Sequence, residues 1–282
     1  MKLTLGTVQF GLTYGINNTL GMPGDEAISN IFEIAGEMGI QVLDTASTYG
    51  EVELKIAKLS NKQFQIITKF PEVKSGMELN EQLNGSLKRL NVDHIYGYLA
   101  HNPDTLIASP DLWEVLLKAK RNGWVEKIGY SLYCPSELKK LLELGYKPDL
   151  VQIPYSLLDR KFESYLPLLK NLDIEIHVRS VFLQGLYFMD IEKLPQKLIP
   201  LKSNLVKLRS LCEMYDVKIG ALALNFVYEN PFIDRVVIGV DSTLHLKQNW
   251  EMINSWNYNP ELMELINSVE VDQKELLNPT NW

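Results

Sequence analysis

The stretch QVLDTASTYGEVE, residues 41–53, determines how the rest of this chain is interpreted. It begins as a short apolar strand that ends at Asp44, and the loop that follows presents Tyr49. A carboxylate at the end of a buried strand is costly unless a cation pairs with it. Two later strand-like segments end in basic side chains, Lys69 and His101. The four side chains therefore form one candidate site if their strands are neighbours.

Short apolar segments, often β-branched, recur along the chain and predict strands that are buried on both faces. Amphipathic segments separate them, such as the helix expected at 25–38. Repeated strand–helix units fit one (β/α)8 TIM barrel, a single domain spanning 1–282, better than an open doubly wound sheet. A long excursion at 186–203 follows the seventh strand, and loops of that length are often functional. The expected strands are 2–7, 41–44, 65–69, 94–100, 126–131, 149–153, 174–179 and 235–239.

Neighbouring parallel strands lie about 5 Å apart, so their ends meet at the carboxyl-terminal rim, where barrel enzymes have their active sites. Tyrosine has an ordinary pKa of about 10, and a nearby Lys69 ammonium is expected to lower the pKa of Tyr49. Asp44 would keep Lys69 charged and oriented. His101 could hydrogen-bond a substrate carbonyl oxygen or relay a proton to Tyr49. This set predicts proton donation to a carbonyl oxygen while the carbonyl carbon accepts another group.

The sequence also indicates which group the carbonyl carbon accepts. No Ser-His-Asp order suggests a hydrolase, and no paired histidines suggest a metal site. A carbonyl without a protein nucleophile needs a hydride donor, and a nicotinamide would supply it. Each of the four residues alone has a structural interpretation, and only the combination favours catalysis. Other side chains stay open: His94 and His177 are expected to be structural, whereas Tyr187, Phe188, Trp256 and Trp282 could line a pocket or simply pack.

Composition sets limits on the protein class. The chain is 46% hydrophobic and 22% charged, which is typical of a globular protein with a substantial core. Its net charge of -7 argues against nucleic-acid binding. Cys134 and Cys212 lack metal or redox spacing, which favours a reducing compartment. There is no charged-then-apolar leader and no apolar run of about 18 residues, so we expect a cytoplasmic protein that does not enter membranes.

Eight fragments, in order, resemble the aldo-keto reductases over nearly the whole sequence. The resemblance implies a (β/α)8 barrel that binds a nicotinamide dinucleotide without a Rossmann motif, and no GxGxxG occurs here. It places the family's catalytic tetrad on Asp44, Tyr49, Lys69 and His101, with Tyr49 as the general acid. The fragments are LGTVQFG at 5–11, LDTASTYGEVE at 43–53, ITK at 67–69, LAHNPD at 99–104, GWVEKIGYS at 123–131, VQIPYSLLDR at 151–160, RSVFLQGL at 179–186 and VIGVDSTLHLKQN at 237–249.

The resemblance also implies a set of cofactor-binding residues. Ser131 and Gln152 match the positions that hold the nicotinamide carboxamide, but Leu132 stands where the family usually has an asparagine. Arg179 occupies a position where many members stack an aromatic ring, and its planar guanidinium could stack as well. The complete implied set is Thr7, Asp44, Ser131, Gln152, Arg179, Ser180, Phe182, Gln184, Gly239, Val240, Asp241, His245, Gln248 and Asn249.

Three questions stay open at this point. Asp241 favours NADH, because a carboxylate repels a 2′-phosphate, whereas His245 and Lys247 favour NADPH. The alternatives to a carbonyl reductase are a regulatory nucleotide-binding barrel that acts through a partner, and an aldolase with Lys69 as a Schiff base. The short loop after His101 and the short tail predict an open pocket that would suit a small carbonyl substrate, such as a sugar or a nucleotide-linked sugar.

Overall fold

The computed structural model describes residues 1–16, 18, 21–61 and 63–282. Between the first strand and the helix predicted at 25–38 we also expect a loop at 11–24, and three of its residues, Asn17, Thr19 and Leu20, lie outside the described residues.

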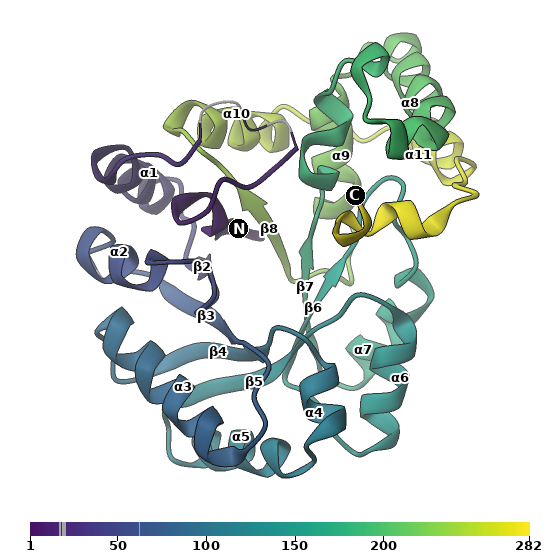
Figure 1. Ribbon diagram of the computed structural model, residues 1–282. Helices are drawn as coiled ribbons and strands as arrows, with labels where there is room; N and C mark the ends of the chain where they lie inside the picture. The colour runs from purple at the N-terminus through teal and green to yellow at the C-terminus, as the bar shows by residue number, and fades with distance from the viewer. Residues whose placement is uncertain (17, 19–20, 62) are drawn as a thin grey trace.

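The strands in the described part of the chain form one closed barrel, in which each strand runs parallel to its neighbours in chain order (Figure 1). Pairing of β8 with β1, from Leu3 with Val236 to Gly6 with Gly239, closes the circle. The predicted TIM barrel is therefore confirmed, and each predicted strand matches an observed one to within one residue at either end. The strands are β1 Leu3–Gly6, β2 Val42–Asp44, β3 Gln65–Phe70, β4 Ile95–Ala100, β5 Val125–Ser131, β6 Leu150–Pro154, β7 Glu175–Arg179 and β8 Arg235–Gly239.

Helices surround the strands on the outside of the barrel (Figure 1). The helix predicted at 25–38 is α1, and α5 ends just before Gly123, whose φ of +76° suits a helix stop. The α-helices are α1 Asp25–Glu37, α2 Val52–Leu59, α3 Gly76–Leu90, α4 Asp104–Ala108, α5 Asp111–Arg121, α6 Pro135–Glu143, α7 Leu166–Asn171, α8 Lys202–Met214, α9 Ile219–Tyr228, α10 Thr243–Asn254 and α11 Pro260–Asn267. The 3-10 helices are Val8–Phe10, Glu163–Tyr165, Leu183–Phe188, Ile191–Lys193, Gln196–Leu201, Lys274–Leu277 and Pro279–Asn281.

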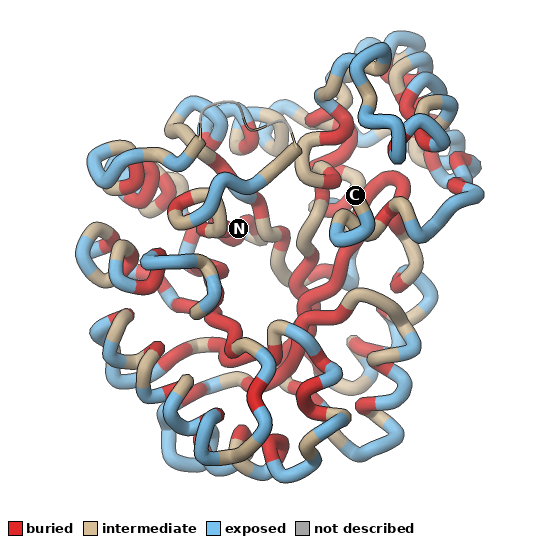
Figure 2. Tube along the Cα trace, viewed as in Figure 1, coloured by how far each residue is buried: buried red, intermediate tan, exposed pale blue. Residues whose placement is uncertain are grey.

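The main core lies between the strands and the inner faces of the helices, where the buried residues concentrate (Figure 2). In α1 the buried side chains are Ile28, Ile31, Phe32 and Ala35, a spacing that places them on one helix face. Burying a large apolar side chain contributes about 1.5–3 kcal/mol, so these helices are held mainly by the barrel that they cover.

A second apolar cluster lies under the excursion that the sequence indicated at 186–203. This segment forms short 3-10 helices rather than an open loop, and it buries Leu186, Leu198 and Leu201. It packs with α8, α9 and α11, which lie together beside the end of the chain in Figure 1. The excursion is therefore part of a packed lobe next to the barrel.

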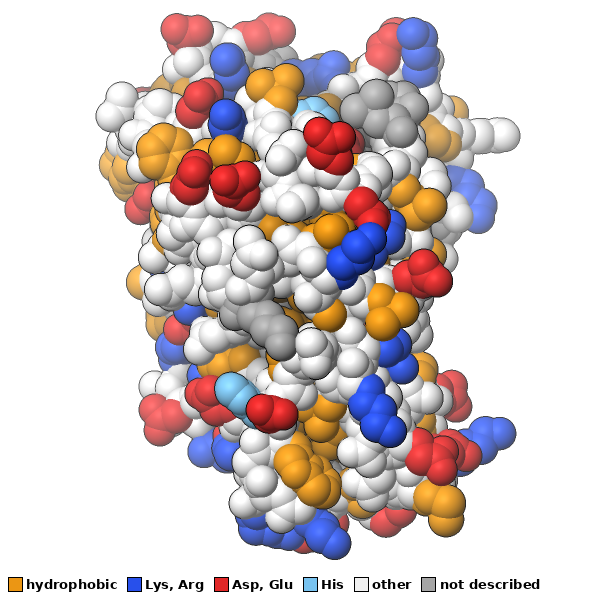
Figure 3. Space-filling model, turned by 90° about the vertical axis from the view of Figure 1, so that its left-hand side faces the viewer, with side chains coloured by type: hydrophobic (Ala, Val, Ile, Leu, Met, Phe, Trp, Pro, Cys, Tyr) orange, Lys and Arg blue, Asp and Glu red, His pale blue; other side chains and the backbone are white. Residues whose placement is uncertain are grey.

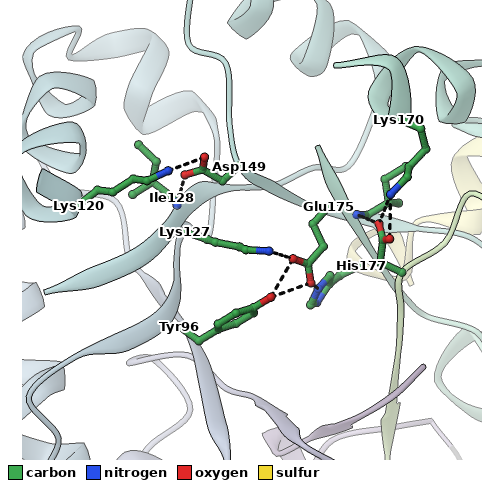
Figure 4. Close-up of polar contacts among 10 residues, drawn as sticks. Tyr96, Lys120, Lys127, Ile128, Asp149, Lys170, Glu175 and His177 are labelled. Atoms are coloured by element: carbon green, nitrogen blue, oxygen red, sulfur yellow. Dashed lines mark hydrogen bonds and ion pairs between the residues drawn. The ribbon is translucent and has the colours of Figure 1, made fainter. Parts of the chain in front are cut away.

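A group of polar side chains meets at Glu175 on β7 (Figure 4). The carboxylate contacts the hydroxyl of Tyr96 at 2.9 Å, Nε2 of His177 at 2.6 Å and the ammonium of Lys127. Burial by itself would raise the pKa of Glu175, but the bonds from these neighbours lower it to about 2. His177 is fully buried, in agreement with its structural interpretation, while His94 is exposed.

The surface carries acidic, basic and apolar side chains interspersed over the face shown in Figure 3. Within the described ranges, none of the helices combines the length and the apolar character needed to cross a membrane.

Candidate active site

Asp44 and Lys69 form a buried ion pair across the ends of β2 and β3. The Lys69 ammonium lies 2.7 and 2.8 Å from the two carboxylate oxygens and also donates to the main-chain oxygen of Thr45 at 2.8 Å. The side chains are only 1% and 6% exposed. A lysine has three N–H donors, so the contacts of Lys69 account for all of them.

Asp44 is also held from two other strands. Gln152 on β6 donates from Nε2 to the Asp44 carboxylate at 2.8 Å. Thr7, just after β1, donates to the main-chain oxygen of Asp44 from both its amide and its hydroxyl, each at 3.0 Å. The pair is thereby fixed by several strands at once, which is the kind of support that a precise active site needs.

Tyr49 lies on the tight turn between β2 and α2. Its amide donates to the main-chain oxygen of Ala46 at 3.1 Å, and Gly50 next to it has a φ of +62°. A Cβ on Gly11 would fall 2.0 Å from the Tyr49 main-chain oxygen, so only glycine allows this close approach. The Lys69 ammonium lies 5.7 Å from the centre of the Tyr49 ring.

The pKa of Tyr49 differs from the sequence-based expectation. Burial, followed by the negative charge of Asp44, raises the pKa of Tyr49 well above its ordinary value, whereas proximity to Lys69 was expected to lower it. That expectation was wrong. The reason is that the phenolate would lose its water, and the Lys69 charge is already neutralised by Asp44.

His101 follows β4 and completes the set. Its ring centre lies 5.7 Å from that of Tyr49, at an interplanar angle of 80°, and its Nδ1 is 3.2 Å from the hydroxyl of Thr48. Burial, and then the charge of Lys69, lower the pKa of His101 to about 4. The imidazole is therefore uncharged at neutral pH.

A cavity of about 470 Å³ extends from Asp44 and Tyr49 to the start of α10. Of the predicted cofactor residues, all except Ser131 line it. Ser131 is only 2% exposed. The predicted residues in the lining are Thr7, Asp44, Gln152, Arg179, Ser180, Phe182, Gln184, Gly239, Val240, Asp241, His245, Gln248 and Asn249.

Several lining residues were missed from the sequence, among them Gln9, Tyr14 and Met252. Tyr14 follows β1 and accepts a bond at 2.9 Å from Gln184, which belongs to the segment after β7. The available signal was its place in a loop at the carboxyl-terminal rim. Phe188 also lines the cavity. By contrast Tyr187, Trp256 and Trp282 pack in or against the second apolar cluster.

The segment after β7 has unusual backbone geometry. Ser180, Leu183 and Gln184 have φ values of 63°, 45° and 54°, in the left-handed region that non-glycine residues seldom occupy. Such conformations cost about 1–3 kcal/mol each and tend to occur at functional sites. Two of the three residues, Ser180 and Gln184, line the cavity.

Arg179, at the end of β7, is held by the residues that follow β5. Its Nη2 donates to the main-chain oxygen of Leu132 at 3.0 Å, and its guanidinium lies 4.5 Å from the centre of the Tyr133 ring. The Leu132 side chain is fully buried and offers no amide in place of the family's asparagine.

At the far end of the cavity, α10 begins with a side-chain cap. Ser242 accepts a bond from the amide of His245 at 3.2 Å. Nδ1 of His245 lies 2.5 Å from Oδ1 of Asp241, so these two side chains contact each other. The start of α10 combines free amide groups with the positive end of the helix dipole, which suits a phosphate group.

These residues fit a nicotinamide dinucleotide. Gln9 lines the cavity, and its Oε1 is buried without a hydrogen-bond partner in the described part of the chain. This oxygen could accept a hydrogen bond from a hydroxyl or amine of a ligand. Gly239 lies against the same side chain, because a Cβ there would fall 2.3 Å from Gln9 Nε2. The start of α10 and the strained segment after β7 also line this cavity, so the rest of a dinucleotide could lie along them.

A closed parallel barrel with this polar group at the carboxyl-terminal rim defines a (β/α)8-barrel enzyme. The chain belongs to the aldo/keto reductase family, whose sequence model matches residues 2–271. It is therefore an oxidoreductase that uses a nicotinamide cofactor.

Relatives agree with this assignment, and a solved structure agrees with the fold. The chain is 26% identical to an uncharacterized oxidoreductase, YrpG, of Bacillus subtilis, over 95% of this chain and 91% of that protein. It is also 26% identical to the NADH-specific methylglyoxal reductase of Escherichia coli, over 90% and 93%. The aldo-keto reductase AKR11C1 from Bacillus halodurans superposes with a TM-score of 0.79 at 22% identity, over 97% of this chain and 94% of that one.

Proposed function

We propose that this protein reduces the carbonyl group of a small aldehyde or ketone to an alcohol, with Tyr49 as the general acid. The observation that carries the proposal is the buried Asp44–Lys69 pair next to a partly buried Tyr49 and an uncharged His101. A bound nicotinamide supplies the hydride that the carbonyl carbon accepts.

Tyr49 gives its proton to the carbonyl oxygen. Because burial raises its pKa, the phenol is protonated at neutral pH and holds the proton that the reaction needs. The phenolate that forms is stabilised by the Lys69 ammonium, 5.7 Å from the ring centre, and Asp44 keeps that ammonium in place. Lys69 is thus a positioning and electrostatic residue. Its engaged donors and 1% exposure argue against a Schiff base.

His101 orients the substrate. In this proposal the Thr48 hydroxyl donates to Nδ1 of His101, so Nε2 carries the ring hydrogen and donates it to the carbonyl oxygen. The low pKa of His101 keeps the ring uncharged, which leaves proton transfer to Tyr49.

The cofactor lies along the cavity with its nicotinamide near Tyr49 and its adenosine near α10. Gln152 would bind the carboxamide, the segment from Ser180 to Gln184 would follow the pyrophosphate, and the start of α10 would bind the adenosine ribose. We propose that NADH is preferred, because Asp241 repels a 2′-phosphate and its contact with His245 occupies the nearest basic side chain. The similarity to an NADH-specific reductase supports the same choice.

The test is turnover. Purified protein is mixed with NADH or NADPH and a panel of methylglyoxal, 4-nitrobenzaldehyde and simple aldoses, and absorbance at 340 nm is followed. Methylglyoxal is included because a relative is named for its reduction. We expect a fall in absorbance with at least one aldehyde. Cofactor binding without turnover of any carbonyl would contradict the enzyme proposal and favour a regulatory barrel.

A further inference from the structure

Arg179 carries a positive charge that the protein itself leaves unbalanced. The charge of Arg179 acts on Asp159, whose carboxylate has a lysine of its own, Lys161 at 3.0 Å. The cavity-lining carboxylate Asp44 is likewise paired, with Lys69 at 2.7 Å. Within the described residues Arg179 forms no ion pair, and its bonds go to a main-chain oxygen and to the hydroxyl of Ser180. The active end of the cavity therefore has an excess of one positive charge.

The position of this charge is fixed. The Tyr133 ring, 4.5 Å from the guanidinium, and the Leu132 main-chain oxygen, 3.0 Å from Nη2, hold it from the β5 side. Arg179 also lines the cavity, so its charge acts on whatever ligand fills that space. Cation–π contact of this kind keeps an arginine in place without neutralising it.

The positive charge of Arg179 acts on Tyr49 and His101. Its charge acts to lower the pKa of Tyr49 against the effect of burial, and it adds to the lowering of the pKa of His101. Arg179 therefore lies close enough to Tyr49 and His101 for its charge to act on both residues.

The nicotinamide ring has to lie in the same place. A hydride can reach a carbonyl carbon only if the ring lies against the carbonyl that Tyr49 protonates, and Arg179 lines that end of the cavity. In the reaction the carbonyl carbon gains a hydride with its two electrons, and its oxygen gains the Tyr49 proton. The dihydronicotinamide is uncharged, and after it has given up the hydride its ring carries a charge of +1.

We infer that Arg179 makes the site discriminate between the two redox states of the cofactor, by disfavouring the cationic oxidised ring relative to the uncharged reduced one. This inference rests on the proposed function. Tighter binding of the reduced form raises the potential of the bound couple, and a tenfold ratio of dissociation constants corresponds to about 30 mV for two electrons. The charge of Arg179 also weakens the binding of the oxidised cofactor, which is a product of carbonyl reduction.

The test is direct binding, without substrate. Dissociation constants of NADH, NAD⁺, NADPH and NADP⁺ are measured by calorimetry for the wild type, Arg179→Gln, Arg179→Met and Arg179→Lys. Arg121→Gln is the matched control, because it removes one exposed positive charge on α5, away from the cavity. Thermal unfolding of each variant confirms that it is folded.

We expect the wild type to bind the reduced form at least tenfold more tightly than the oxidised form. Arg179→Gln and Arg179→Met should reduce that ratio by at least tenfold, mainly through tighter binding of the oxidised form, whereas Arg179→Lys and Arg121→Gln should keep it. A ratio that stays within threefold in the neutral variants, or an equal loss of both forms, would overturn the inference while leaving the proposed function intact. A wild type that binds neither form would overturn both.

Discussion

The ammonium of Lys69 lies within 2.8 Å of both carboxylate oxygens of Asp44, and both side chains are almost completely buried. Pairs of this kind often contribute little net stability, because removing two ions from water costs about as much as their attraction returns. Their loss one at a time is damaging, however, because the remaining charge is buried without a partner. We therefore attribute the Asp44–Lys69 pair to a role in the candidate active site rather than to the stability of the fold.

Replacement of Tyr49 by phenylalanine should lower kcat by about a hundredfold or more, because the phenol acts only in the chemical step. Cofactor affinity should change less than threefold. Steady-state kinetics and a cofactor titration on the same preparation test this. A variant that retained more than about a tenth of wild-type kcat would show that another group donates the proton.

Single replacements of the buried pair should destabilise the fold more than the double replacement. Lys69→Met and Asp44→Asn should each lower the free energy of unfolding, by up to about 3–5 kcal/mol for the lysine variant, since a buried charge loses its partner. The double variant should recover part of the stability and none of the activity. Urea unfolding of all four proteins measures this. Additive losses would mean that the two side chains are not coupled.

The pH dependence of kcat/KM should reflect the lowered pKa of His101. Because the pKa of His101 lies near 4 instead of about 6.5, the imidazole stays uncharged down to about pH 5. The value of kcat/KM should therefore be flat between pH 7 and 5 and fall only as the pH approaches 4. A decline centred near pH 6.5 would show that His101 has an ordinary pKa in the working enzyme, and the variant His101→Asn serves as the control.

Cofactor preference should respond to Asp241 and His245. His245→Arg should improve NADPH binding relative to NADH, because a guanidinium is always charged and binds phosphate through two bonds. Asp241→Ala should act in the same direction, since a carboxylate repels the 2′-phosphate. Fluorescence titration with both cofactors measures the ratio. If neither variant changed it by threefold, about 0.65 kcal/mol, the 2′-position would be recognised elsewhere.

Glu175 should stabilise the fold in a pH-dependent way. Its pKa in the folded protein is about 2, below its ordinary value of 4.5, so the contribution is present above pH 4.5 and is lost as the pH falls through 2. The shift corresponds to about 3 kcal/mol. Urea unfolding of wild type and Glu175→Gln between pH 6 and 2 tests this. A difference in stability that stayed constant over the range would contradict the assignment.

The sequence determined the barrel and the four residues at its rim. Short buried strands can pair in parallel only with helices between them, and Asp44 and Lys69 end neighbouring strands, so their meeting followed from strand order. The cap at Ser242 and the break at Gly123 were also local properties of the chain.

Only the tertiary structure showed the properties that depend on burial and on contacts between loops. The pKa of Tyr49 is raised because the ring is partly buried and because Asp44 already neutralises Lys69, and no spacing in the sequence reveals either fact. Tyr14 and Phe188 line the cavity because loops remote in sequence meet there. Within the described residues Arg179 has no ion pair, because the carboxylates Asp44 and Asp159 are paired with lysines, and the count of charged residues in a chain does not show which of them are paired.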